Sequence, residues 1–177
     1  LHLSSRRQRQ MCIRDSACIV VTILLTEFIL NFVIINANIP SGSMENTIMT
    51  NDKLIALRTS YWFNDPKRGD IIIFKYPDDE TEWFIKRVIA LPGETVLVKD
   101  GKVYINGSKK ALSEPYIKEE PVEDFGPYKV PKNGYFVMGD NRNNSNDARE
   151  WETHYVSRDE VLGKAWFRYY PSIKVIK

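Results

Sequence analysis

The hydrophobic pattern changes character at about residue 36. Residues 17–35 are apolar except for four polar residues, one of which is Glu27. A helix of this length spans roughly 28 Å at about 1.5 Å per residue, which just crosses the hydrocarbon core of a bilayer. Glu27 disfavours membrane insertion of this helix, because a carboxylate near the bilayer centre costs about 3 kcal/mol in insertion experiments. The pattern predicts a transmembrane anchor at 17–35, and the alternatives are a buried helix and a cleaved secretory signal.

Beyond Pro40, short β-branched or aromatic runs alternate with turn residues about every ten positions. Asp100–Gly101 predicts a two-residue hairpin turn, because such turns need positive φ. The uninterrupted run Ile71–Ile73 predicts a strand that is covered on both faces. We therefore expect an all-β domain over 36–177, with strands at 53–58, 70–76, 82–91, 95–99, 102–105, 135–138 and 162–169.

The first 16 residues, LHLSSRRQRQMCIRDS, have no apolar periodicity and no relation to the rest of the chain. We expect residues 1–16 to be a non-native leader and exclude them from the fold argument. The remaining chain is long and apolar enough for one core, since 43% of the 177 residues are hydrophobic. A net charge of +2 gives no electrostatic reason to expect nucleic acid as a partner.

Cysteine and histidine are scarce, which limits the chemistry. Both cysteines lie in the first 18 residues, and the two histidines are His2 and His154. A thiolate or multi-histidine zinc site cannot be built from these residues, so we expect no metal and no cofactor.

The segment Pro40–Met44 (PSGSM) comes after the apolar helix and places two hydroxyls around a glycine. Small residues suit a serine nucleophile, which the substrate backbone must approach closely. A solvated turn is the alternative for an isolated SGS. The base could be His154, but its polar surroundings also suit an exposed loop residue. Lys86 lies among apolar neighbours and could serve if burial lowers its pKa, although it could equally extend its amine to solvent.

A polar loop, Gly139–Arg149, comes directly after an apolar strand. It could be an ordinary Asx-rich loop. Its alternating Asp and Arg residues could instead form paired supports for a site, and Ser145 could donate a hydrogen bond to a neutral lysine. The aromatic triplet 61–63 could rest at the headgroup level of a membrane or pack in the core.

Four blocks, in order, resemble the bacterial type I signal peptidases, and the short chain is similar to their Gram-positive form. The blocks are Ile39–Met44 (IPSGSM), Gly69–Phe74 (GDIIIF), Phe84–Gly93 (FIKRVIALPG) and Gly139–Arg149. One block is weakly specific, whereas four in order with compatible spacing are highly specific. The resemblance implies coiled antiparallel β-sheets of the LexA/signal peptidase type behind one N-terminal transmembrane helix.

The activity implied by the resemblance is that of a serine endopeptidase. Ser43 would be the nucleophile and Lys86 the general base, in a Ser/Lys dyad that forms an acyl-enzyme. The oxyanion hole would consist of the Ser43 N–H and the Ser41 hydroxyl. Ser145 would orient Lys86. The enzyme would cleave signal peptides from exported preproteins after small residues, in the pattern Ala-X-Ala.

The resemblance also implies roles for residues that support the site. Asp140 would pair with Arg87, while Asp147 and Arg149 would brace the same region, and Met44 would lie near the first substrate pocket. The partners implied are signal peptides of secreted preproteins, the lipid bilayer and the Sec pathway, with a monomeric enzyme on the extracytoplasmic side of the bacterial plasma membrane.

The chain departs from the family pattern at three positions that carry no chemistry. Asn46 stands where the family usually has proline, Ala148 replaces a common serine, and Glu152 replaces a glycine after Trp151. Two other functions remain open on the residues alone. A self-cleaving repressor of the LexA kind would need a helix-turn-helix domain, and a non-catalytic membrane-tethered module would leave Lys86 with an ordinary pKa.

Overall fold

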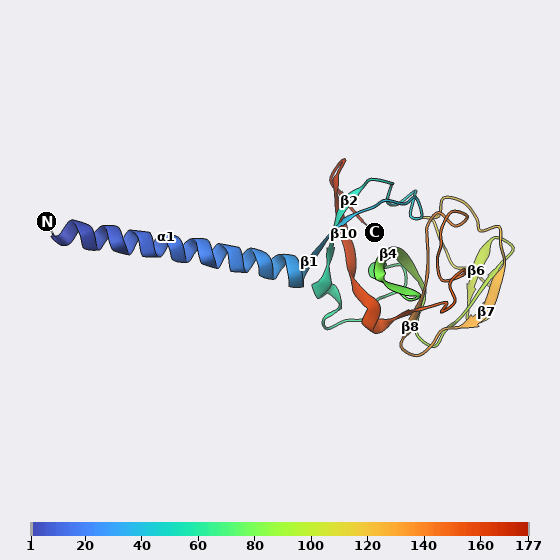
Figure 1. Ribbon diagram of the computed structural model, residues 1–177. Coiled ribbons are helices and arrows are strands. Elements are labelled where there is room, and N and C mark those ends of the chain that lie inside the picture. Colours follow the sequence, from blue (N-terminus) through green and yellow to red (C-terminus); the bar gives the residue numbers. More distant parts are fainter. Residues whose placement is uncertain (1, 177) are drawn as a thin grey trace.

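The computed structural model describes residues 2–176, with side chains from residue 15 onward. A long helix, α1 (His2–Phe28), projects from a β-domain (Figure 1). A π-helical turn, η1 (Ile29–Val33), continues α1 and is followed by extended backbone. The predicted apolar helix over 17–35 is therefore present, but it ends two residues early. Its last two residues open the first strand instead, because their apolar side chains suit a strand as well as a helix.

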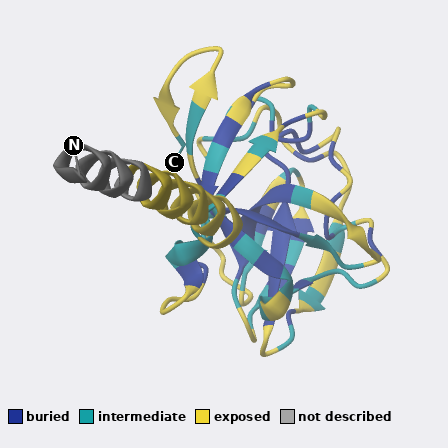
Figure 2. Cartoon of the chain, turned by 60° about the vertical axis from the view of Figure 1, so that its left-hand side comes forward, coloured by how far each residue is buried: buried dark blue, intermediate teal, exposed yellow. Residues whose placement is uncertain are grey.

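The β-domain buries no residue of the apolar helix over 15–33. Asp15–Val33 has a mean hydropathy of 2.1 and is long enough to cross a membrane, and none of that segment is buried (Figure 2). The alternative of a buried core helix is therefore wrong, while an anchor and a secretory signal both fit. The predicted non-native leader at 1–16 stays a prediction, since the side chains up to residue 14 lie outside the described part.

The domain consists of antiparallel strands in two sheets, so the expected all-β fold class behind one N-terminal helix is confirmed. The larger sheet has the order β1-β2-β10-β3-β4-β8-β9, with β11 beside β10, and the smaller has the order β6-β5-β7. The strands are β1 (Ile34–Asn38), β2 (Lys53–Leu57), β3 (Ile71–Tyr76), β4 (Asp79–Ala90), β5 (Thr95–Lys99), β6 (Lys102–Ile105), β7 (Phe125–Lys129), β8 (Gly134–Met138), β9 (Val156–Ser157), β10 (Val161–Tyr170) and β11 (Lys174–Val175).

Local sequence explains several of these elements. Asp100 and Gly101 have φ values of 50° and 74°, which confirms the predicted turn between β5 and β6. Two single-turn 3₁₀ helices, Arg58–Tyr61 and Arg158–Glu160, connect strands of the larger sheet. A capping box between Ser157 and Glu160 starts the second of them.

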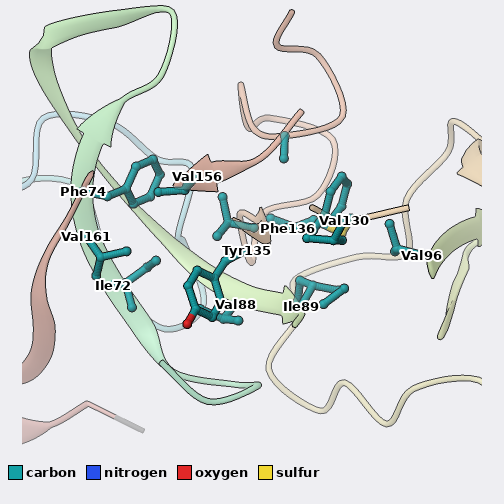
Figure 3. Close-up of a cluster of buried hydrophobic side chains, with 14 of the residues drawn as sticks. Ile72, Phe74, Val88, Ile89, Val96, Val130, Tyr135, Phe136, Val156 and Val161 are labelled. Atoms are coloured by element: carbon teal, nitrogen blue, oxygen red, sulfur yellow. The ribbon is translucent and has the colours of Figure 1, made fainter. Parts of the chain in front are cut away.

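Strand β3 lies between two hydrophobic clusters, as its uninterrupted apolar run predicts. Ile72 and Phe74 belong to the larger cluster (Figure 3), and Ile71 and Ile73 belong to the smaller one. All four side chains are buried because alternate residues of a strand point to opposite faces. Strand β4, which pairs with β3, is thereby held between two packed layers, and it carries the candidate lysine into the domain.

Candidate active site

The serine segment is a tight turn that two buried side chains fix to the smaller cluster. The turn begins after β1 and is closed by hydrogen bonds from Glu45 N to Gly42 O (3.1 Å) and from Ile48 N to Met44 O (2.8 Å). Met44 and Ile48 are 0% and 1% exposed. Ser43 lies between these anchors and the end of β1, so its position is set by the core rather than by solvent.

Lys86 points into the domain and meets this serine. Its Nζ lies 2.7 Å from Ser43 Oγ, and its position on β4 is opposite Ile72 of β3. The side chain is only 4% exposed, so the alternative of a lysine that extends to solvent is wrong. Burial lowers the pKa of Lys86 from 10.5 to about 8, although the charges of Asp147 and Asp140 oppose that change.

Two further donors lie around Ser43. The Ser41 hydroxyl is 3.4 Å from Ser43 Oγ. The Ser43 N–H has no acceptor among the described residues. A hydroxyl and a free backbone N–H beside a serine are the kinds of group that stabilise a developing oxyanion.

The loop 139–149 reaches the serine turn because Gly139 has no side chain. A Cβ at Gly139 would overlap Ser145 Oγ and would lie 2.5 Å from the carbonyl oxygen of Ser43. Ser145 is 6% exposed and lines the same groove as the dyad, yet its hydroxyl has no hydrogen-bond partner in the described part of the chain. The expected hydrogen bond to Lys86 is thus not formed here, although the serine is buried at the same site.

Buried ion pairs hold this loop. Arg87 donates from Nε and Nη2 to the two carboxylate oxygens of Asp140, at 2.8 and 2.7 Å, so the structure brings together the two residues that the family resemblance pairs. Arg149 likewise donates from Nε and Nη2 to the two carboxylate oxygens of Asp147, which also accepts from the Gly139 N–H. Because each carboxylate meets two guanidinium nitrogens, the loop has a fixed orientation.

One buried pair was missed by sequence reasoning. Arg142 donates to both carboxylate oxygens of Glu114, at 3.0 and 2.6 Å, and also to the Gly139 carbonyl. Glu114 lies in an irregular segment that no periodic pattern marks. The charge alternation of the loop was the only signal, and it did not identify the partner.

His154 does not belong to the site. Its Nδ1 lies 2.8 Å from the carbonyl oxygen of Ala148, and its ring packs edge-on against Phe125 and Tyr128. It does not line the groove that contains Ser43. His154 is therefore excluded as the base by its position. Within the residues whose side chains are described, no group of three or more His, Cys, Asp or Glu side chains could hold a metal ion.

A groove of about 900 Å³ opens onto Ser43 and Lys86. Its walls are β1 with the serine turn, the segment Glu82–Lys86 of β4, and the loop residues 143–146 with Glu150. Among the described residues, β1 is an edge strand that pairs only with β2. β8 pairs with β4 only from Arg87 onward, so the groove-lining part of β4 also has an unpaired edge. The groove therefore lies between two strand edges that could each accept an extended chain.

Comparison with known proteins identifies the family. The family model described as signal peptidase, peptidase S26, matches residues 12–170. The chain belongs to this family. A probable signal peptidase I-2 of Synechocystis sp. is 44% identical over 161 residues, which are 88% of this chain and 72% of that protein. Signal peptidase I T of Bacillus subtilis is 37% identical over 86% of this chain and 82% of that protein.

A crystal structure of a signal peptidase I from Enterococcus faecalis V583 is also similar, with 36% identity and a TM-score of 0.49. It covers 57% of this chain and 97% of the other. The enzyme class that the four sequence blocks imply, signal peptidase I, is confirmed by the family match and by the Synechocystis and Bacillus relatives. The comparisons therefore establish the enzyme class, whereas the roles of single residues rest on the geometry of the site.

Asn46, where the family usually has proline, has a φ of 91°. Proline holds φ near −65° and could not adopt this conformation. The Asn46 amide donates to the carbonyl oxygen of Tyr116 (2.9 Å), which ties the serine turn to the irregular segment that carries Glu114. Met44 is fully buried and does not line the groove, so its place at a substrate pocket stays a prediction.

Proposed function

We propose that this protein is a membrane-bound serine endopeptidase that removes signal peptides with a dyad of Ser43 and Lys86. The observation that carries the proposal is the 2.7 Å hydrogen bond between Lys86 Nζ and Ser43 Oγ at a buried site. A pKa of about 8 supports it, because a neutral lysine can accept a proton whereas a charged one cannot. The roles of Ser41, Ser145 and the ion-paired residues are part of the same proposal.

The reaction would proceed through an acyl-enzyme. Neutral Lys86 takes the proton of Ser43 as Oγ attacks the scissile carbonyl carbon. The oxyanion is held by the Ser43 N–H and the Ser41 hydroxyl. Lys86 then gives its proton to the departing amine, and the carbon–nitrogen bond breaks. Water, which loses a proton to Lys86, attacks the ester, and Ser43 regains its hydrogen as the acid product leaves.

The substrate would bind as a strand added between β1 and β4. Four antiparallel pairings separate these strands in the sheet, so they run in the same direction. β1 begins where the apolar helix ends and leads towards Ser43. A signal peptide that leaves the membrane beside the helix would therefore run along β1 and present its scissile bond at the serine. We propose Ala-X-Ala before the cut, because this preference accompanies the family.

The membrane part of the proposal rests on the uncovered apolar helix and on neighbouring aromatic residues. The 3₁₀ helix Arg58–Tyr61 contacts η1 at the end of the apolar segment. Tyr61 is buried, whereas Trp62 and Phe63 are 53% and 91% exposed. Exposed aromatic rings beside an apolar helix suit the headgroup level of a bilayer. An extracytoplasmic monomer acting after the Sec pathway completes the proposal.

The test is cleavage of a preprotein with an Ala-X-Ala junction by the full chain in detergent. The unmodified protein should release the mature protein, with the new N-terminus directly after the second alanine. Ser43→Ala and Lys86→Ala should each abolish the cleavage. Lys99→Ala, an exposed lysine at the end of β5, is the matched control and should cleave at the unmodified rate. Equal activity of the unmodified protein and the Ser43→Ala variant would refute the proposal.

A further inference from the structure

Asn141 is a buried residue that contacts the serine turn at three points. Its side-chain Nδ2 donates to the carbonyl oxygen of Gly42 at 3.0 Å and also lies 3.5 Å from Glu45 Oε2. Its backbone N–H donates to the carbonyl oxygen of Ser43 at 3.0 Å, and Asn141 is 2% exposed. The two carbonyl acceptors belong to the peptide groups on either side of the Ser43 Cα. One residue therefore fixes both backbone dihedral angles of the serine.

The side-chain bond has a specific consequence for the Ser43 N–H. The Gly42 carbonyl and the Ser43 N–H belong to one planar trans peptide group, so they point in opposite directions. When Asn141 holds that carbonyl on one side, the N–H is turned to the other side. The N–H has no acceptor among the described residues and stays available to a substrate. A hydrogen bond to the carbonyl also polarises the peptide group and strengthens its N–H as a donor.

Asn141 is itself held in place by its neighbours in the chain. Asp140 forms two hydrogen bonds with Arg87, and Arg142 forms two with Glu114. Both ion pairs are buried. An amide placed between two residues with buried, bidentate partners has little freedom to move, so its hydrogen bonds have a defined direction.

We infer that Asn141 is a positioning residue that aims the Ser43 N–H at the oxyanion. The inference rests on the proposed peptidase function and adds a residue to which the sequence assigned no role. Asn141 does not line the groove and forms no hydrogen bond with Lys86. Its loss should weaken binding of the oxyanion and leave the binding of uncleaved substrate unchanged.

The test compares Asn141→Asp and Asn141→Ala with Asn106→Asp in the full, detergent-solubilised chain. Asp at 141 keeps the size but cannot donate. Asn106 uses its side-chain oxygen to accept from the Thr95 N–H, and aspartate retains that acceptor. Cleavage of an Ala-X-Ala peptide gives kcat and KM. Removing a direct oxyanion donor lowers kcat roughly 100- to 1000-fold. The Asn141 variants keep the Ser43 N–H and lose only the hydrogen bond that orients it, so their kcat should fall roughly 10- to 100-fold, with KM unchanged.

Two further readouts separate positioning from stability. A peptide aldehyde, to whose carbonyl Ser43 Oγ adds while the aldehyde oxygen gains the proton, mimics the tetrahedral state. Its affinity should fall by the same factor as kcat. In Asn141→Ala, which adds no charge near Lys86, the midpoint of the pH–rate curve should not move. Unchanged kcat, a shifted midpoint in Asn141→Ala, or losses that only follow the unfolded fraction would each overturn the inference. No cleavage by the unmodified chain would instead contradict the proposed function.

Discussion

The titration of Lys86 gives a prediction with two independent readouts. Burial lowers its pKa from 10.5 to about 8. At pH 7, Lys86 would then be neutral in about a tenth of the molecules. With the ordinary pKa of 10.5 it would be neutral in about three of ten thousand, so burial increases the neutral fraction about 300-fold. Because the base must be neutral, kcat/KM should rise with pH through about 8 and then level off. A midpoint near 10.5, or a fall in rate over this range, would refute the reasoning.

The same pKa change predicts an effect on stability. Between pH 8 and 10.5 the unfolded state binds more protons at Lys86 than the folded state, so stability rises with pH in this window. Below pH 8 the charged lysine costs the folded state about 3 kcal/mol, at about 1.4 kcal/mol per pH unit. Lys86→Met removes this cost and also loses the hydrogen bond to Ser43, worth about 1 kcal/mol.

Urea unfolding of the full chain at pH 7 and pH 10.5 measures the difference. Lys86→Met should raise the free energy of unfolding by about 2 kcal/mol at pH 7, which is the cost of about 3 kcal/mol less the lost hydrogen bond. The gain should disappear at pH 10.5. The exposed control Lys99→Met should change neither value. An Lys86→Met variant that is less stable than the unmodified chain by the same amount at both pH values would contradict a buried, pKa-shifted lysine.

Two other predictions concern the loop behind the dyad. Asp140→Asn removes the charge that neutralises the buried Arg87 and should lower the free energy of unfolding by about 3–5 kcal/mol; a loss below about 1 kcal/mol in urea unfolding would contradict a structural ion pair. Gly139→Ala forces a Cβ against Ser145 Oγ and the Ser43 carbonyl, so it should cost about 1–3 kcal/mol of stability and displace the serine. Its kcat should fall, and unmodified kinetics would show that the loop can retreat without disturbing the nucleophile.

The sequence predicted strands where apolar periodicity and turns agree. Strands Thr95–Lys99 and Lys102–Ile105 have the predicted bounds. The two-residue turn Asp100–Gly101, in which both residues have positive φ, fixes where one strand ends and the next begins. Strand β1 was missed because Ile34 and Ile35 continue the apolar run of the helix without a polar boundary. Strand β7 was missed because Gly126 and Pro127, both rare in strands, interrupt it.

The site was predictable where residue chemistry is distinctive and not where pairing depends on the fold. The scarcity of histidine favours a lysine base, but Ser43 and Lys86 were singled out by the resemblance of their sequence blocks to the signal peptidases. Asn141 was not, since its importance lies in two backbone carbonyls that no sequence pattern reveals. Asn46 shows the same limit: only its φ of 91° explains why the turn departs from the family's proline.

The central claim is that Ser43 attacks the substrate with Lys86 as its base. The most direct measurement is an acid quench of the full chain during turnover of an Ala-X-Ala preprotein, followed by mass spectrometry of its peptides. The account predicts that the peptide containing Ser43 carries the signal peptide as an ester, and that Ser43→Ala and Lys86→Ala give neither the ester nor the product. Cleavage by Ser43→Ala at the unmodified rate, or an acyl group on another residue, would contradict it.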